Sequence, residues 1–194
     1  PFSPDGGLRL MKGNIGRGVI KVSAVKDHCR IIEAPAIVFD DQKEVLAAFE
    51  RGELERDFVC IVRFQGPRAN GMPELHKLTP PLAILQDRGF QVALVTDGRM
   101  SGASGKVPAA IHMSPETLLG GGIGKIRTGD IIRFNSHTGE LTALVDEAEW
   151  NGRETATADL SGNLHGIGRE LFAGFRSITG SAETGAMSLG GDFG

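Results

Sequence analysis

The apolar and polar positions along the chain predict several short strands. Residues 18–25 alternate between the two classes, as a strand with one buried face does. Residues 58–64 and 91–96 are apolar runs rich in β-branched side chains, which is typical of strands buried on both faces. Pro35 interrupts the apolar run 30–39, so an edge or irregular strand is expected there because proline cannot donate to a ladder.

Helix signals separate these strands. Asp41 offers the N-cap of a helix that runs to about Arg51. Pro73 could open a short helix, and Pro80 starts another, because proline is tolerated in the first turn of a helix. A helical pattern also covers 164–175.

The order of these elements indicates one domain with a mixed sheet. Strands at 130–134 and 140–145 are expected to form a hairpin, which does not fit a clean βαβ alternation. We therefore expect an α+β or mixed α/β fold, with a barrel-like mixed sheet flanked by helices. Residues 1–17 are expected to be an irregular, linker-like start, and 18–194 the domain itself. The chain begins at Pro1 rather than at methionine, which suggests a fragment.

Charge and cysteine content narrow the functional class. The net charge of −3 provides no strong field for nucleic acid or membrane, and no run approaches the roughly 18 apolar residues of a membrane span. Cys29 and Cys60 form no CxxC motif, so neither a zinc knuckle nor a self-contained iron–sulfur site is expected. Two buried thiols in a reducing cytoplasm fit this pattern, and a disulfide stays open as the alternative.

Two polar loops could carry chemistry. The loop 65–75 (QGPRANGMPEL) holds the carboxylate of Glu74, and the loop 96–105 (TDGRMSGASG) places glycines on both sides of Ser101. Both follow apolar strands, where α/β proteins commonly bind ligands. By spacing alone, Glu74 is a first-turn glutamate that complements a helix dipole, and Ser101 is a turn serine that bonds its own loop.

These two loops resemble the paired signature motifs of the dihydroxy-acid/6-phosphogluconate dehydratase family. The motifs are GPRANGMPEL and TDGRMSG, and MSPE at 113–116 and GDIIRF at 129–134 also fit. The shorter loop with Asn70 is similar to the 6-phosphogluconate branch rather than to the dihydroxy-acid branch. The likeness covers nearly the whole chain, and it implies a barrel flanked by helices, like the swivelling domain of aconitase-like enzymes.

The resemblance also implies a reaction. Members of this family remove water from a 2,3-dihydroxy acid, and in this branch 6-phospho-D-gluconate becomes 2-dehydro-3-deoxy-6-phosphogluconate in the Entner–Doudoroff pathway. A 4Fe–4S cluster, bound by an N-terminal domain that this chain lacks, would withdraw the C3 hydroxyl. Mg²⁺ or a similar cation would hold the carboxylate and C2 oxygen. The isolated chain would be inactive, its partners being the N-terminal domain and a second subunit in a full-length homodimer.

The family's motifs assign two roles to residues of this chain. Glu74 matches a carboxylate ligand of the divalent cation, and Ser101 matches the base that takes the C2 proton as an alkoxide. Some relatives carry threonine where this chain has Ala103, and Ser104 could substitute for it.

Charge and position add further candidates for binding the substrate and its phosphate. They lie in or beside the two loops: Arg68, Asn70, Arg99 and Lys106. Two alternative functions stay open, namely another sugar-acid or dihydroxy-acid dehydratase of the same family and a barrel that binds a partner or small molecule without catalysis.

Overall fold

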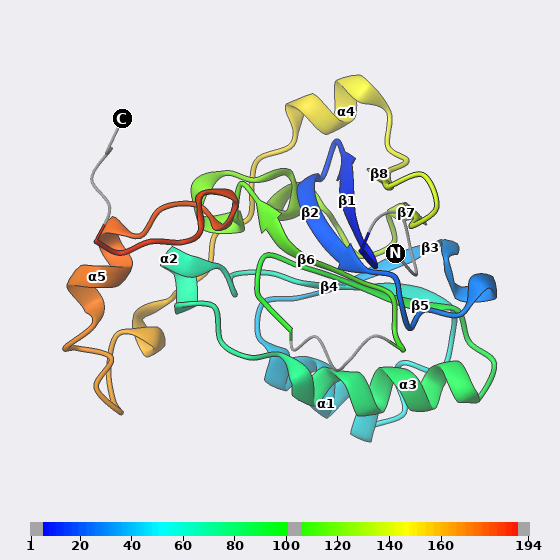
Figure 1. Cartoon of the computed structure of the whole chain (residues 1–194), viewed down its shortest axis with the longest axis horizontal. Helices are drawn as coiled ribbons and strands as arrows, with labels where there is room; N and C mark the ends of the chain where they lie inside the picture. The colour runs from blue at the N-terminus through cyan, green and yellow to red at the C-terminus, as the bar shows by residue number, and fades with distance from the viewer. Residues whose placement is uncertain (1–5, 101–105, 190–194) are drawn as a thin grey trace.

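A closed β-barrel forms the centre of the molecule in the computed structural model, which describes residues 6–100 and 106–189 (Figure 1). Its strands are β1 (Leu8–Gly13), β2 (Gly16–Lys21), β3 (Ile31–Phe39), β4 (Phe58–Val62), β5 (Val92–Thr96), β6 (Ala109–Ser114), β7 (Ile131–Asn135) and β8 (Glu140–Ala143). Around the barrel the order is β1-β2-β6-β5-β4-β3-β7-β8, and β8 closes on β1. The neighbours β3, β4, β5 and β6 run parallel, whereas most other pairs are antiparallel. The mixed barrel expected from the sequence is therefore confirmed.

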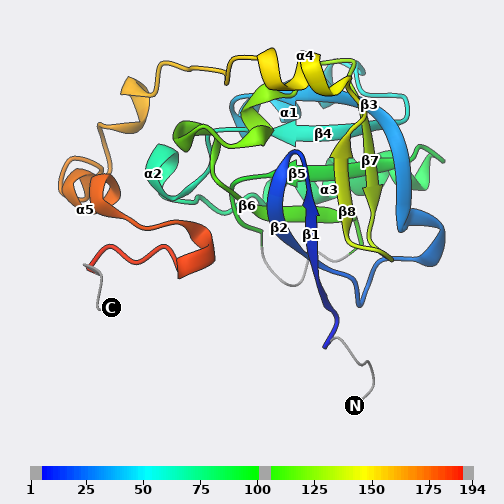
Figure 2. The ribbon, with the colours of Figure 1, turned by 90° about the horizontal axis from the view of Figure 1, so that it is seen from above.

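The helices lie outside the barrel. They are α1 (Gln42–Glu50), α2 (Pro67–Asn70), α3 (Thr79–Asp87), α4 (Glu147–Gly152) and α5 (Ala173–Ile178). Short 3-10 helices occur at Asp27–Cys29, His76–Leu78, Thr117–Leu119, Gly122–Lys125, Ser161–Asn163 and Ala182–Thr184. Helices α1 and α3 run along one side of the barrel, and α2 lies beside α5 at one end of the molecule (Figure 2). No helix in the described part of the chain is both long and apolar enough to cross a membrane.

Two apolar cores explain why the central strands are apolar on both faces. In β4, Val59 and Ile61 point into the barrel interior, whereas Phe58, Cys60 and Val62 belong to a second core shared with α1 and α3. All five side chains are fully buried, because side chains alternate between the two faces of a strand and each face has its own core. The strand predicted over 58–64 is thus confirmed, and β5 follows the same arrangement.

The predicted first helix is confirmed by its cap. The side chain of Asp41 accepts a hydrogen bond from the backbone N–H of Lys43 at 2.7 Å, and Glu44 accepts one from the N–H of Asp41 at 3.3 Å. This reciprocal capping box satisfies N–H groups that the first turn would otherwise leave without partners. The expected hairpin is also present, since β7 pairs with β8 from Ile132 opposite Ala143 onward.

The irregular start expected over 1–17 is wrong for residues 8–13, which form β1. Met11 of this strand is fully buried in the barrel interior. The more conspicuous apolar residues, Leu8 and Leu10, point outward and are about half exposed. The two leucines lie on the outer face of the strand and Met11 lies on the inner face. The segment therefore lacks the pattern of a buried apolar face, and the strand could not be recognised from alternation.

For residues 30–39 the sequence left an edge strand or an irregular strand open, and the structure shows a strand inside the barrel that changes partner. Strand β3 pairs with β7 from Ile31 to Pro35 and with β4 from Ala36 to Phe39. The strand changes partner directly after Pro35, so the missing N–H of proline falls where the β4 ladder has not yet begun. Proline is accommodated here because the two ladders meet at this residue.

Two helix expectations are corrected by the structure. Pro67 rather than Pro73 lies in the first turn of α2. The pattern over 164–175 yields only α5, which begins at Ala173, because Gly166 and Gly168 adopt positive φ angles of 85° and 77° before it.

The two cysteines are free, so the disulfide alternative is not realised. Cys60 is buried as expected, and this burial raises the pKa of its thiol. Cys29 is partly exposed, and the expectation of burial is wrong for it.

A buried ion pair joins α4 to the start of β7. The guanidinium of Arg153, whose side chain is 5% exposed, contacts Asp130 at 2.5 Å and 2.9 Å. Burial alone would raise the pKa of Asp130, but the hydrogen bonds from Arg153 and from the N–H of Arg127 outweigh it and hold this pKa below its usual range. Arg153 also lies over the ring of Trp150 at 5.9 Å.

We expect Arg153→Ala to lower the free energy of unfolding by about 3 kcal/mol near pH 7, because it leaves the Asp130 carboxylate buried without its cation. At pH values above the ordinary pKa of aspartate, the ionised Asp130 contributes its full stabilisation to the fold. This stabilisation is lost as the pH falls through the lowered pKa of Asp130. The difference between variant and wild type should therefore shrink in acid. Urea denaturation across pH measures it, with the exposed Arg133→Ala as the control; equal losses in both variants would contradict the expectation.

Candidate functional site

The two loops singled out in the sequence lie side by side. Glu74 and Arg99 form an isolated parallel bridge, in which the N–H of Leu75 donates to the carbonyl of Arg99 at 3.1 Å. The Arg99 guanidinium donates to the Glu74 carboxylate at 2.7 Å and to the carbonyl of Met72 at 2.8 Å. The loops meet because they follow β4 and β5, which are parallel neighbours whose carboxyl ends reach the same edge.

A buried carboxylate holds this edge together. The two oxygens of Asp97 accept hydrogen bonds from the N–H groups of Gln65 at 2.8 Å and Thr117 at 2.9 Å. Burial raises the pKa of Asp97, although the two N–H donors act in the opposite direction. Asp97 thus joins three segments: the end of β5, the loop after β4 and the 3-10 helix at Thr117–Leu119.

A second carboxylate fixes the short helix α2. The oxygens of Glu116 accept from the N–H groups of Arg68 at 3.0 Å and Ala69 at 3.2 Å, in the first turn of that helix. Burial raises the pKa of Glu116, and the nearby charge of Asp97 adds to this rise. Gly66 makes room for the contact, since a Cβ at this position would overlap the Glu116 carboxylate.

Sequence reasoning did not identify Asp97 or Glu116. Both stood in recognised motifs, TDGRMSG and MSPE, and Asp97 directly follows a buried strand. A carboxylate at the end of an apolar run was the available signal. Because their oxygens are occupied by backbone N–H groups, we interpret both residues as positioning the loops rather than as reacting groups.

The other candidates of the first loop turn toward the C-terminal segment. The Arg68 guanidinium donates to the carbonyl of Thr179 at 2.6 Å. The amide nitrogen of Asn70 donates to the side chain of Gln65 at 3.2 Å, and its buried Oδ1 has no hydrogen-bond partner among the described residues.

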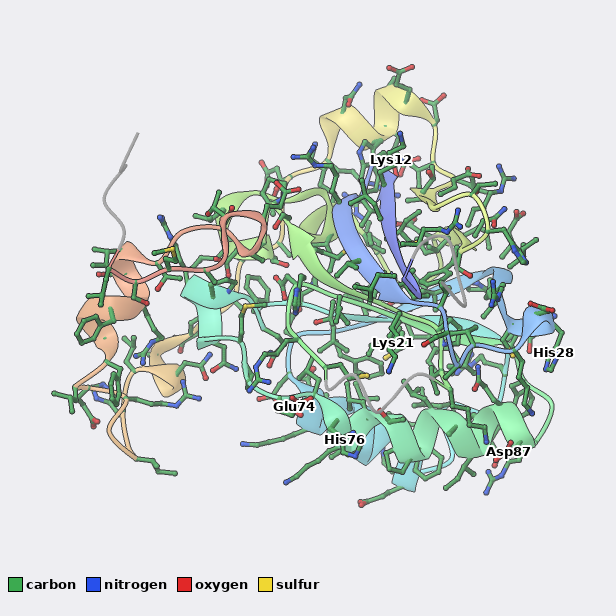
Figure 3. The ribbon with its side chains drawn as sticks, viewed as in Figure 1. Lys12, Lys21, His28, Glu74, His76 and Asp87 are labelled. Atoms are coloured by element: carbon green, nitrogen blue, oxygen red, sulfur yellow. The ribbon has the colours of Figure 1, made fainter. Side chains whose placement is uncertain are left out.

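Lys106 lies away from this edge. Its ammonium group contacts both carboxylate oxygens of Asp87 at 2.7 Å. Figure 3 shows Asp87 and Glu74 near opposite ends of α3, so Lys106 is not brought to Glu74. Ser101 and Ser104, the remaining candidates, lie outside the described residues.

A cavity of about 670 Å³ separates the first loop from the C-terminal segment. Arg99 and Asn70 line it on the side of the two loops, and Arg169 and Arg176 line it on the side of α5. Two aromatic side chains of the same segment complete this wall, Phe172 and Phe175. The arginines of this wall were not singled out in the sequence, because nothing in the pattern of residues 164–188 indicated that they face the motif loops.

The described residues offer a metal ion only part of a site. Among them, no group of three or more histidine, cysteine, aspartate or glutamate side chains is arranged to hold a metal. Glu74 supplies one carboxylate whose side chain is 35% exposed. A carboxylate oxygen is a suitable ligand for a hard divalent cation, and the role of Glu74 as such a ligand stays a prediction.

Comparison with known proteins agrees with the motif resemblance. A family model described as dihydroxy-acid/6-phosphogluconate dehydratase C-terminal matches residues 1–186. The phosphogluconate dehydratase of Pseudomonas aeruginosa is 64% identical over 97% of this chain and 31% of that protein. The phosphogluconate dehydratase of Escherichia coli is 59% identical over the same shares, and the dihydroxy-acid dehydratase of Pyrococcus furiosus is 36% identical over 96% of the chain and 33% of that protein. The chain thus spans about a third of the length of these relatives.

We expect Gly66→Ala to lower the free energy of unfolding by about 1–3 kcal/mol, because the added methyl group must displace Glu116 from the first turn of α2. Gly152→Ala is the matched control, since a methyl group there meets open space. Thermal or urea denaturation of both variants measures the effect. An equal response of the two variants would show that the contact between Gly66 and Glu116 is not tight.

Proposed function

Because the chain belongs to the dihydroxy-acid/6-phosphogluconate dehydratase family, we propose that it is the C-terminal domain of a hydro-lyase acting on 6-phospho-D-gluconate. The product would be 2-dehydro-3-deoxy-6-phosphogluconate. Identities of 53–64% to several phosphogluconate dehydratases, against 36% to a dihydroxy-acid dehydratase, support this substrate. The observation that carries the proposal is the bridge between Glu74 and Arg99, which joins the two family motifs at one edge of the barrel.

We propose that this chain supplies one ligand of a shared cation site and that the ligands of the iron–sulfur cluster belong to the rest of the protein. Glu74 would be one oxygen ligand of Mg²⁺, and Cys60 is enclosed in the core between β4 and the helices, where it reaches no cluster. When bound, the cation and the iron–sulfur cluster, held by the rest of the protein, would withdraw electron density from the substrate's oxygens.

The tasks of this chain are orientation and proton transfer. Arg99 holds the Glu74 carboxylate in place through its ion pair and is itself fixed by the carbonyl of Met72. By the family's motif, the oxygen of Ser101 would accept the C2 proton. The electrons of the C2–H bond would then form the C2–C3 double bond as the C3–O bond breaks. The C3 hydroxyl would leave with the electron pair of that bond and become water after taking up a proton, and the enol would tautomerise to the keto acid. A serine needs a strongly lowered pKa for this step, which a neighbouring cation would provide.

The partner proposed for this domain is the remaining part of the same protein, which makes up about two thirds of the relatives' length. The C-terminal segment exposes several large apolar side chains to solvent, and exposed apolar surface is typical of a docking surface. These side chains include Ile167, Leu171, Phe172, Ile178 and Leu189, each more than half exposed. The two free cysteines are consistent with a reducing, cytoplasmic location.

The assay that tests the substrate uses the full-length protein with its cofactors. It compares 6-phosphogluconate with gluconate and with 2,3-dihydroxy acids that lack phosphate. We expect the phosphorylated acid to have the highest kcat/KM. Preference for an unphosphorylated acid would favour another member of the family, and turnover by the isolated 194 residues would contradict the division of the site between two domains.

In the full-length protein, we expect Glu74→Gln to raise the Mg²⁺ concentration for half-maximal activity by about tenfold or more, because the amide is a poorer cation ligand. The rate at saturating Mg²⁺ should fall as well. Metal titrations of the activity measure both effects, with the exposed Glu140→Gln as the control. An unchanged titration would remove Glu74 from the cation site.

We expect Ser101→Ala to lower kcat by about 10²- to 10⁴-fold, since the variant lacks the oxygen that accepts the C2 proton. The iron content and the visible absorbance of the cluster should stay at wild-type values. Exchange of the substrate's C2 proton with solvent deuterium provides a second measurement, and it should be lost in this variant. Ser23→Ala, on the exposed surface, is the control; wild-type turnover by Ser101→Ala would exclude the residue as the base.

A further inference from the structure

We propose that the cavity between the first loop and the C-terminal segment is a phosphoanion site, whose main ligands are Arg169 and Arg176, with Arg99 on the opposite wall. This inference rests on the proposed function, because the anion would be the phosphate of the substrate. It assigns the phosphate to a segment that sequence reasoning had not considered. Lys106, one of the residues proposed for this role from the sequence, is paired with Asp87 instead.

Two guanidinium groups are held next to one another on this wall. Arg169 donates to the carbonyl oxygen of Asn163 at 3.0 Å, and Arg176 donates to the same oxygen at 3.3 Å. Sharing one neutral acceptor brings two positive charges close together, which costs free energy unless a negative charge lies nearby. Each guanidinium has five N–H donors, so most of them stay available for a phosphate.

The surroundings neutralise these charges only in part. No aspartate or glutamate lines the cavity within the described part of the chain, although the protein as a whole carries a net charge of −3. Neither arginine forms an ion pair with a described residue at 4.0 Å or less. Glu170 is adjacent to Arg169 in sequence, and its carboxylate accepts from the N–H of Gly166 at 2.8 Å and lies 3.8 Å from His165. The Gly166 N–H, and to a smaller extent the charges of His165 and Arg176, lower the pKa of Glu170, so this carboxylate offsets part of the positive charge of Arg176. The cavity is thus a local concentration of positive charge.

The other groups of the cavity suit the rest of a sugar acid. Its volume of about 670 Å³ lies within the range of small-molecule sites. The buried Oδ1 of Asn70 has no partner among the described residues and could accept a hydrogen bond from a substrate hydroxyl. Arg99 connects this cavity to Glu74, so a substrate whose carboxylate lies near Glu74 could place its phosphate toward Arg169 and Arg176.

Calorimetric titration of the 194-residue chain with inorganic phosphate, 6-phosphogluconate and gluconate tests the site. We expect both phosphate-containing ligands to bind more tightly than gluconate, and their affinity to fall with ionic strength. Arg169→Gln and Arg176→Gln should each weaken the binding of these two ligands by about 10- to 100-fold, because a charged hydrogen-bond donor is lost. Arg133→Gln, in strand β7, does not line the cavity and is paired with Glu33, so it should change nothing.

Arg176→Lys separates the loss of a ligand from the loss of the local fold, since lysine keeps the positive charge but not the two-pronged donor geometry of arginine. It should bind phosphate more weakly than the wild type and more tightly than Arg176→Gln. In the full-length protein, Arg176→Gln should raise KM for 6-phosphogluconate by a larger factor than it lowers kcat. Circular dichroism of each variant checks that the fold is retained.

Two results would overturn the inference. One is unchanged affinity for phosphate in the glutamine variants, and the other is equal binding of gluconate and 6-phosphogluconate by the wild-type chain. Failure of the proposed function would look different, because the full-length protein would then bind 6-phosphogluconate through these arginines without dehydrating it.

Discussion

The buried carboxylate of Asp97 is the interaction on which the candidate site depends. Removing a carboxylate from water is costly, and the N–H groups of Gln65 and Thr117 compensate for part of that cost. These hydrogen bonds fix the direction of the chain where it leaves the neighbouring parallel strands β4 and β5. Arg99, two residues beyond Asp97, is thereby placed against Glu74. The meeting of the two family motifs is therefore a consequence of one satisfied buried charge and not only of strand order.

The barrel and the C-terminal segment contribute to the site in different ways. The edge that carries Glu74 and Arg99 is supported by two apolar cores and is part of the barrel domain itself. The segment beyond the last strands is largely exposed, and polar contacts such as Arg68 to Thr179 and Arg17 to Glu183 attach it to the barrel domain. Covering the exposed apolar side chains of this segment would hold its cavity wall more firmly, and the proposed contact with the rest of the protein would provide that cover.

Several elements were predictable because local chemistry decides them. The Asp41 capping box and the apolar run of β4 both act over a few residues, so their patterns are readable in the sequence. Strand β1 was missed because its exposed leucines carry the apolar signal, and the role of β3 was misjudged because the change of partner at Pro35 involves residues far along the chain. Long-range pairing of this kind leaves no local pattern.

The sequence by itself determined the family, the barrel class and the two motif loops, because these depend on residue order within short segments. It also marked Glu74 and Ser101 through the resemblance. Only the tertiary structure decided which charged groups share a site: it paired Lys106 with Asp87 and brought Arg169 and Arg176 opposite Arg99. The reason is physical, since charges interact through distances in space, and the closure of the barrel sets those distances between residues that lie far apart in the chain.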